Sequence, residues 1–233
     1  MKILVIGGNG FLGYHLVNQL LKKNHNVTIL DLNLNNLKNF KKVKKIKGDF
    51  TNRKILSNAI NNKDCVFHLA GVGDLDYAMK NPIKVIKYNI EGTARVLNEC
   101  RKHKIKRFIY ASSIYSISQE GSFYRFGKKA AEDYIMEYSK QYNLNYTILR
   151  YGSLYGPRSP KNNGVRKIIE KAIKSKQVTY YGSIKNKRKY IFVRDASICS
   201  VEGDMSGFNS FLLGCHKLLI NWQLRCLISI SKL

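Results

Sequence analysis

Short apolar runs alternate with helix-like segments over residues 1–150 of the chain. Residues 2–7, KILVIG, form a continuous apolar run that ends in glycine, which is typical of a strand buried on both faces of a sheet. Helical spacing of apolar positions follows at 11–23 and again at 125–142. Further runs have the composition of strands: 26–31, 42–49, 64–71, 107–113 and 145–150.

Another helix is predicted to open at Asn81-Pro82, because Asn is a favoured capping residue and Pro suits the first helical turn. Its apolar residues fall at helical spacing: Ile83, Ile86, Ile90 and Leu97. Such alternation of strands and helices predicts an α/β fold, a Rossmann-type doubly wound parallel sheet with helices on both faces. Ligands of these sheets bind beyond the carboxyl ends of the strands.

The pattern changes after residue 150, where the turn-rich segment YGSLYGPRSPKNNG begins. We therefore expect a nucleotide-binding Rossmann domain over residues 1–150 and a small, incomplete substrate-binding lobe over 151–233. Within this lobe, residues 164–176 are helix-like and 189–195 are strand-like, whereas the pattern fades in an atypical tail at 197–233.

Composition argues against several classes of protein. Hydrophobic residues make up 44% of the chain, as in ordinary globular proteins. The apolar segments are too short for a transmembrane helix or a signal-peptide core, so we expect a cytoplasmic protein without membrane association. The five cysteines are irregularly spaced and form no CxxC, so neither a disulfide framework nor a metal site is expected.

The net charge of +26, from 41 basic and 15 acidic residues, raises the possibility of a nucleic-acid partner. The lysines, however, are spread along the whole chain instead of forming one basic arm. This distribution favours a solvated surface that attracts anionic substrates, and no nucleic-acid partner is expected.

A glycine motif, GxxGxxG, lies between the first predicted strand and the first predicted helix at Gly7, Gly10 and Gly13. Glycines at these positions permit a tight turn and a close approach of the backbone to a pyrophosphate. The helix that starts at Phe11 and Leu12 then offers free N–H groups and a positive dipole end to the phosphates. The motif therefore predicts a dinucleotide site.

Asp31 ends the second predicted strand, where a carboxylate can accept hydrogen bonds from the adenosine ribose and would repel a 2′-phosphate. This position favours NAD over NADP. Asp49 follows the third predicted strand, and it either contacts the adenine amino group or serves as a turn residue.

Tyr124 and Lys128 form a YxxxK pair, and their spacing places them on one helix face. A phenol ionises near pH ~10, and a neighbouring ammonium is expected to lower that pKa towards neutrality. The pair therefore predicts a general base that acts on a hydroxyl. Ser113 ends the preceding strand and either bridges substrate and tyrosine with its hydroxyl or is a turn residue.

Together, these segments resemble the extended branch of the short-chain dehydrogenase/reductase superfamily, in particular the NAD-dependent epimerase/dehydratase family. The matching pieces appear in family order over residues 1–196: GGNGFLG (7–13), Asp31, GD (48–49), HLAG (68–71), NIEGT (89–93), ASS (111–113), YRFGKKAAE (124–132), LRYGSLYGPR (149–158) and RKYIFVRDA (188–196).

The resemblance implies that Tyr124 is the catalytic base, Lys128 its partner and Ser113 a hydroxyl relay. It implies NAD as the cofactor, contacted by Gly7, Gly10, Phe11, Leu12, Gly13, Asp31, Asp49, Phe50, Leu69, Ala70, Gly71, Asn89, Lys128 and Tyr151. The implied substrate is a nucleotide sugar, bound by Ser153 and by Arg188, which would contact the diphosphate. A homodimer formed through helices of the Rossmann domain is implied as well.

The chain departs from the family pattern in three ways. Tyr124 follows Ser113 after only eleven positions, where extended members usually carry a longer loop. Residue 127 is Gly where Ser is usual, and residue 153 is Ser where Asn is frequent. Family members continue well past the RKYIFVRDA-like segment, so the resemblance implies a C-terminal truncation of the substrate lobe.

The implied function is NAD-dependent epimerisation of a nucleotide-activated sugar through a transient keto intermediate. A sugar 4,6-dehydratase and a keto-sugar reductase are alternatives, although dehydratases usually carry Asp-Glu where this chain has Ile114 and Tyr115. A truncated NAD-binding protein without activity and a nucleic-acid binder are alternatives from other classes.

Overall fold

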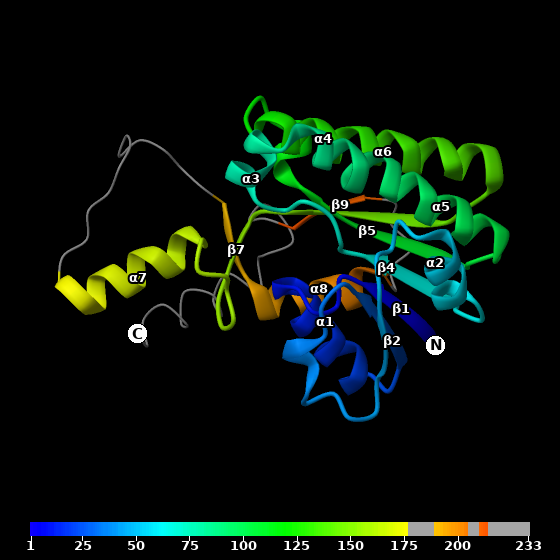
Figure 1. Ribbon diagram of the computed structural model, residues 1–233, viewed down its shortest axis with the longest axis horizontal. Coiled ribbons are helices and arrows are strands. Elements are labelled where there is room, and N and C mark those ends of the chain that lie inside the picture. The colour runs from blue at the N-terminus through cyan, green and yellow to red at the C-terminus, as the bar shows by residue number, and fades with distance from the viewer. Residues whose placement is uncertain (177–188, 205–209, 214–233) are drawn as a thin grey trace.

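The computed structural model describes residues 1–176, 189–204 and 210–213. Its centre is a seven-stranded parallel sheet (Figure 1). The strands are β1 (Lys2–Ile6), β2 (Asn26–Asp31), β3 (Lys44–Lys47), β4 (Cys65–His68), β5 (Arg107–Ser113), β6 (Tyr146–Tyr151) and β9 (Ser210–Leu213). Their order, β3-β2-β1-β4-β5-β6-β9, confirms the predicted Rossmann-type doubly wound sheet.

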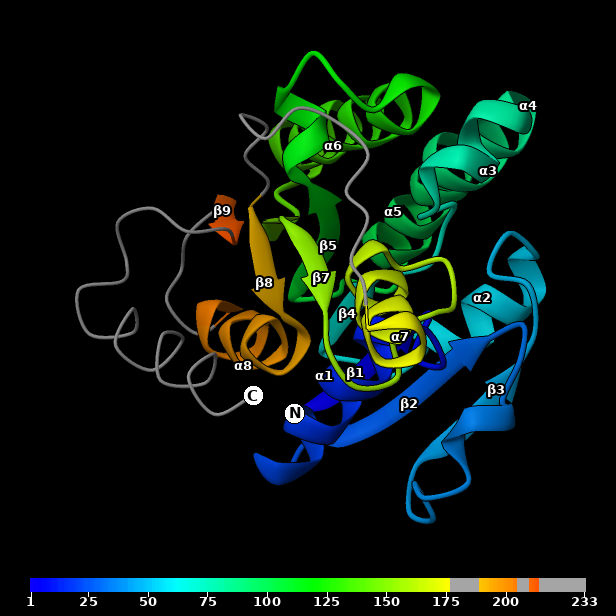
Figure 2. The same cartoon turned by 90° about the vertical axis from the view of Figure 1, so that its left-hand side faces the viewer.

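Helices cover both faces of this sheet. The described residues form these helices: α1 (Phe11–Lys22), η1 (Asn35–Leu37), α2 (Arg53–Ile60), α3 (Leu75–Lys80), α4 (Pro82–Val85), η2 (Ile86–Glu91), α5 (Gly92–Lys102), η3 (Ile114–Ile117), α6 (Ser122–Tyr142), α7 (Gly164–Ser175) and α8 (Val193–Asp204). On one face α1 packs against α8, and on the other α5 packs between α2 and α6 (Figure 2). Within the described residues, no helix has both the length and the apolarity that a membrane crossing requires. The cytoplasmic location stays a prediction.

Alternating side chains of the buried strands divide the core into two layers. Ile3 and Val5 of β1 belong to the layer that includes α1 and α8. Leu4 and Ile6 belong to the layer that includes α2, α5 and α6. Because successive side chains of a strand point to opposite faces, a strand covered on both sides needs the continuous apolar run seen in the sequence.

The helix predicted to open at residues 81–82 is interrupted: it begins as α4, passes through the π-helical η2 and continues as α5. A π-helical stretch closes its hydrogen bonds over one more residue than an α-helix, so the face that points to the core changes. Ile83 in α4 and Ile86 at the start of η2 are 73% and 52% exposed, so the helical spacing of these two positions does not mark a buried face. Val85 and Asn89 are buried instead.

Beyond residue 150 the chain forms a second, two-stranded sheet and then returns to the first. β7 (Ser153–Tyr155) pairs in parallel with β8 (Tyr190–Phe192), and α7 projects away from the main sheet (Figure 1). The segment 189–195, expected to be strand-like, contains β8 and the start of α8. Next, β9 extends the main sheet beside β6. The domain boundary at residue 150 stays a prediction.

Candidate active site

The glycine-rich turn between β1 and α1 lies at the carboxyl edge of the sheet. Gly7 has φ +89°, a backbone conformation that residues with a side chain rarely adopt. A Cβ on Gly7 would lie 2.7 Å from the backbone nitrogen of Ala70, and a Cβ on Gly13 would lie 2.2 Å from the carbonyl oxygen of Gly7. Both positions therefore require glycine, as the motif predicts.

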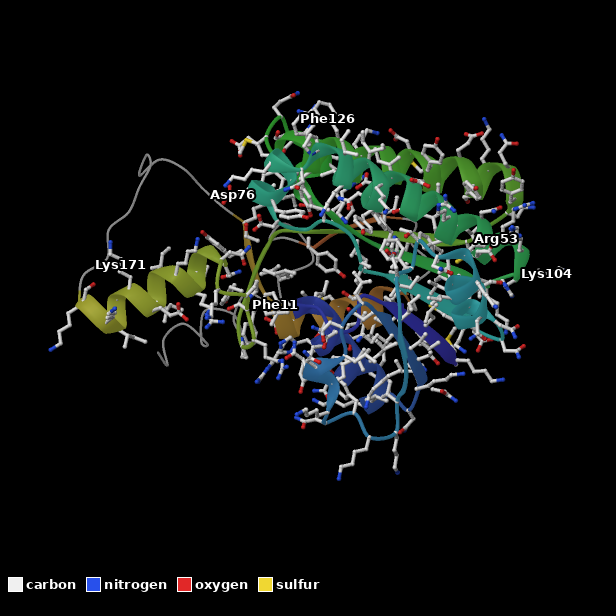
Figure 3. The ribbon with its side chains drawn as sticks, viewed as in Figure 1. Phe11, Arg53, Asp76, Lys104, Phe126 and Lys171 are labelled. Carbon is white, nitrogen blue, oxygen red and sulfur yellow. The ribbon has the colours of Figure 1, made fainter. Side chains whose placement is uncertain are left out.

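The start of α1 offers backbone N–H groups to an anion. Gly10 occupies the N-cap without a side-chain cap, and the first turn carries no acidic side chain. Figure 3 shows Phe11 at the end of α1 nearest the β7 segment. N–H groups in the first turn, here Phe11, Leu12 and Gly13, have no acceptor within the helix, and the helix dipole adds to their attraction for anions. These residues fit the pyrophosphate of NAD.

Asp31 ends β2 next to this turn. Its carboxylate accepts hydrogen bonds from the backbone N–H groups of Asn9 at 2.9 Å and Asn33 at 3.1 Å. These bonds hold the carboxylate beside the turn, at the sequence position of the ribose acceptor in dinucleotide-binding folds. Asp49 instead accepts hydrogen bonds from the N–H and the hydroxyl of Thr51, both at 2.8 Å, as a turn residue does. A contact between Asp49 and adenine stays a prediction.

The segment that follows β4 lies against the glycine-rich turn and is held by Asn89. The Asn89 amide donates to the carbonyl of Val72 at 3.0 Å and accepts from its N–H at 2.7 Å. Gly71 has φ +141°, and a Cβ there would lie 2.7 Å from Oδ1 of Asn89. Leu69 and Ala70 both donate backbone hydrogen bonds to the end of β1. Asn89 thus fixes the loop that borders the predicted cofactor site.

Because residue 127 is glycine, α6 approaches Asn89 closely. A Cβ at Gly127 would lie 2.6 Å from Cγ1 of Val85 and 3.2 Å from Cβ of Asn89. The departure from the family's usual serine therefore coincides with a tight contact between α6 and the α4–η2 segment. Through Asn89 and the loop that it holds, the helix that carries Tyr124 and Lys128 is connected to the glycine-rich turn.

Ser113, Tyr124 and Lys128 lie together at the carboxyl end of β5. The Ser113 hydroxyl is close enough to the Tyr124 phenol to act on its pKa, and the Tyr124 ring packs edge-on against Tyr115 at a centroid distance of 6.2 Å. The buried Nζ of Lys128 donates to the carbonyl of Ala111 at 2.7 Å and lies 5.8 Å from the centroid of the Tyr124 ring. The short connection between β5 and α6 therefore still brings the predicted trio together.

Burial dominates the electrostatics of this trio. Burial raises the pKa of Tyr124 to about 12, although the hydrogen bond with Ser113 acts in the opposite direction. Burial lowers the pKa of Lys128 to about 8, against the Glu132 carboxylate, which raises it. The expectation that Lys128 lowers the pKa of Tyr124 is wrong for this arrangement, because the ammonium donates to Ala111 and not to the phenol.

Three further predicted site residues lie within the described part of the chain, and a fourth lies outside it. Phe50 is buried in the core layer with α2 and α5. Tyr151 is buried in the other layer, and its hydroxyl lies 2.7 Å from Oγ of Ser200 on α8. Ser153 is half-buried at the start of β7. Arg188 lies outside the described residues. Contacts of these four residues with cofactor or substrate stay predictions.

Glu132 is a buried residue next to the trio that the sequence pattern alone did not indicate. It lies one helical turn beyond Lys128 and accepts hydrogen bonds from Ser112, Ser116 and Arg150. Glu132 follows Lys128 at the same four-residue spacing that separates Lys128 from Tyr124, so it lies on the same helix face. This spacing is the sequence signal by which Glu132 could have been found.

The sequence profile of the NAD dependent epimerase/dehydratase family matches residues 3–200 of this chain. The dTDP-D-glucose 4,6-dehydratase of Dictyostelium discoideum is 32% identical, over 83% of this chain and 53% of its own length. A putative UDP-glucose 4-epimerase of Methanocaldococcus jannaschii is also 32% identical, over 84% of this chain and 70% of its own length. The chain thus spans about half of the length of the Dictyostelium dehydratase and 70% of the length of the Methanocaldococcus epimerase.

Solved structures show the same likeness. The UDP-glucose 4-epimerase of Thermotoga maritima, solved with UDP-glucose, has a TM-score of 0.83 at 27% identity, covering 92% of this chain and 77% of that one. The UDP-glucose 4-epimerase of Thermus thermophilus, solved with NAD, has a TM-score of 0.81 at 26% identity, covering 92% and 78%. With sheet order, sequence motifs and these relatives in agreement, the chain belongs to the NAD dependent epimerase/dehydratase family, whose cofactor is NAD.

Proposed function

We propose that this chain is an NAD-dependent epimerase of a nucleotide-activated sugar, which it converts through a transient keto sugar. One observation carries the proposal. The glycine-rich turn and the trio of Ser113, Tyr124 and Lys128 lie at the same edge of the sheet, and Asn89 connects them. The relatives in this family carry the names of nucleotide-sugar epimerases and dehydratases.

Tyr124 is the proposed base. Its phenol hydrogen-bonds with Ser113, so a sugar hydroxyl that joins this pair would pass its proton to the phenolate. Lys128, buried one helical turn away, donates to the Ala111 carbonyl in the chain without cofactor. The phenolate would therefore have to be favoured once NAD is bound, when the positive charges of the oxidised nicotinamide and of Lys128 act together. When bound, NAD supplies the redox chemistry by accepting a hydride from the same carbon and returning it. After the keto sugar has turned within the site, Tyr124 returns the proton to the oxygen of the inverted centre.

A 4,6-dehydratase is the second candidate, because one relative carries that name. Loss of water from a keto sugar needs an acid and a base besides the tyrosine. Ile114 and Tyr115 stand directly after Ser113 at the start of η3, and the Tyr115 ring packs against Tyr124. Neither side chain offers a carboxyl group, so this part of the site favours epimerisation.

Product analysis by NMR separates the candidate reactions. The purified full chain is incubated with NAD and, in separate samples, UDP-glucose, UDP-galactose and dTDP-glucose. An epimerase gives a mixture of two sugars that differ at one ring carbon, with no net consumption of cofactor. A deoxy keto sugar would show a dehydratase, and net formation of NADH together with a keto sugar, which is carbonyl reduction run in reverse, would show a reductase. NAD binding without any product would support the non-catalytic alternative.

We further infer that the chain forms a homodimer through the α4–η2 segment and α6. Large apolar side chains are exposed on these helices, including Ile83 at 73%, Ile86 at 52% and Phe126 at 58%. Figure 3 shows Phe126 on the side of α6 that faces away from the sheet. Because α4 and η2 both pack against α6, these side chains lie on neighbouring helices. Exposed apolar side chains are costly in water, and a second copy of the chain would cover them.

A further inference from the structure

A buried ionic pair lies directly behind the proposed catalytic trio. Glu132 of α6 is fully buried, whereas the side chain of its partner Arg150 on β6 is 22% exposed. Arg150 Nε lies 3.0 Å from Oε1 of Glu132, and its Nη2 lies 2.6 Å from Oε2. Burial acts to raise the pKa of Glu132, but the hydrogen bonds from Arg150 and from two serines outweigh it and hold the pKa below its usual value. Glu132 is therefore a carboxylate at neutral pH.

The same carboxylate holds the end of β5 and the turn that follows it. Ser112 Oγ donates to Oε1 of Glu132. Ser116 Oγ lies 2.7 Å from that oxygen and 2.8 Å from the carbonyl oxygen of Ser113, so its one proton is shared between two acceptors. The Ser113 hydroxyl in turn accepts the N–H of Tyr115 at 3.3 Å. Two hydrogen bonds thus connect Glu132 to the backbone of Ser113.

Three residues on one face of α6 contact three consecutive positions of β5. The pairs are Tyr124 with Ser113, Lys128 with the Ala111 carbonyl, and Glu132 with Ser112. Contacts at three neighbouring positions fix where α6 lies along β5 and how the helix is rotated about its own axis. The pair closest to the middle of the helix, Glu132 with Ser112, is the one anchored by an ion pair to β6.

We propose that Glu132 is a positioning residue that holds the backbone of Ser113, and with it the place of the Ser113 hydroxyl, through Ser112 and Ser116, and that it stabilises the Lys128 ammonium by its charge. The inference rests on the proposed function, because the place of the Ser113 hydroxyl matters to a reaction only if Ser113 and Tyr124 contact a substrate. Small displacements of reacting groups cost rate steeply, so the effect falls on kcat. Glu132 itself is fully buried, so KM stays unchanged.

Ser116→Ala removes the connection between Glu132 and Ser113 with the loss of a single hydroxyl. Ser118→Ala is the matched control, because Ser118 Oγ lies 3.2 Å from the carbonyl oxygen of Tyr115 and its hydrogen bonds among the described residues stay within 115–120. We expect kcat of Ser116→Ala to fall by about tenfold at unchanged KM and melting temperature. Ser118→Ala should keep the parent kcat. A Ser116→Ala protein with the parent kcat would overturn the positioning role.

The charge of Glu132 has a readout that needs no substrate. The groups that face Lys128 are the rings of Tyr110 and Tyr124, the buried His68 and the Glu132 carboxylate. NMR titration of lysine Nζ, with the signal identified by its loss in Lys128→Met, should give a pKa near 8 in the parent. Glu132→Gln should lower this pKa.

Asp133→Asn is the control for this titration, because it removes an exposed carboxylate from the neighbouring position of the same helix. This variant should titrate as the parent does. Equal Lys128 titrations in Glu132→Gln and in the parent would overturn the inference. A parent chain with no turnover on any nucleotide sugar would instead contradict the proposed function, and the titration would still decide the charge effect of Glu132.

Discussion

His68 shows how one buried side chain couples the stability of this fold to pH. Its ring is fully buried in the layer beneath the predicted cofactor loop, with Nε2 3.2 Å from Oγ1 of Thr93. Within the described residues its Nδ1 has no hydrogen-bond partner. Burial, helped by the positive charge of Lys128, lowers the pKa of His68 to about 3. The folded chain therefore keeps this imidazole neutral over most of the acidic range.

Replacement of His68 by leucine should flatten the pH dependence of folding. In the unfolded chain the imidazole binds a proton below pH ~6.5, whereas in the folded chain it does so only near 3. The unfolded state thus holds more protons in this window, and the free energy of unfolding falls as pH drops through it, by about 1.4 kcal/mol per unit of pKa shift. Urea denaturation at neutral and at acidic pH measures the slope. Equal slopes in His68→Leu and the parent would contradict this account.

At the scale of elements, the sequence predicted the strands better than the helices. The predicted strand at 107–113 coincides with β5, because its central residues 108–111 form the apolar run that a strand covered on both faces needs. The sequence could not predict which side chains of α4 and η2 point to the core. The spacing of Ile83 and Ile86 is equally compatible with an uninterrupted α-helix. The start of α8 at Val193 was missed because it follows β8 without a turn signal.

The candidate site was predicted where a motif requires a backbone shape or a fixed spacing. The glycine-rich turn, Asn89 and the YxxxK pair all lie where the sequence suggested. Contacts between elements distant in sequence were not predictable in the same way. Arg150 meets Glu132 only because β6 lies beside β5 under α6, and burial at that place also reverses the expected direction of the Tyr124 pKa.

The tight contact between Gly127 of α6 and Val85 of α4 can be tested by substitution. Alanine at a helix interior position is intrinsically favoured over glycine by about 1 kcal/mol. A Cβ at Gly127 would nevertheless lie 2.6 Å from Cγ1 of Val85, and overpacking of this kind costs about 1–3 kcal/mol. We expect Gly127→Ala to destabilise the parent. In a Val85→Ala background, which frees the space, the same change should stabilise the chain. Equal effects in both backgrounds, measured by urea denaturation, would refute the steric account.

At the scale of the whole molecule, the helices on one face of the sheet carry exposed apolar surface that the proposed homodimer would cover. We expect the parent chain to sediment as a dimer. Phe126→Glu, which puts a charge on that surface, should sediment as a monomer. Ile173→Glu is the control, because Ile173 is 77% exposed on α7, which projects away from this face (Figure 1). A monomeric parent, or a dimer that Ile173→Glu disrupts and Phe126→Glu does not, would contradict the proposed interface.

The central claim is that the glycine-rich turn binds NAD while Tyr124, at the same edge of the sheet, carries out proton transfer. Calorimetric titration with NAD, run in parallel with turnover of the nucleotide sugar, tests both halves in the parent, Tyr124→Phe and Gly13→Ala. Tyr124→Phe should bind NAD as the parent does and show no turnover. Gly13→Ala should lose NAD binding, because its Cβ would lie 2.2 Å from the Gly7 carbonyl oxygen. Turnover by Tyr124→Phe at the parent rate would contradict the account, as would undiminished NAD binding by Gly13→Ala.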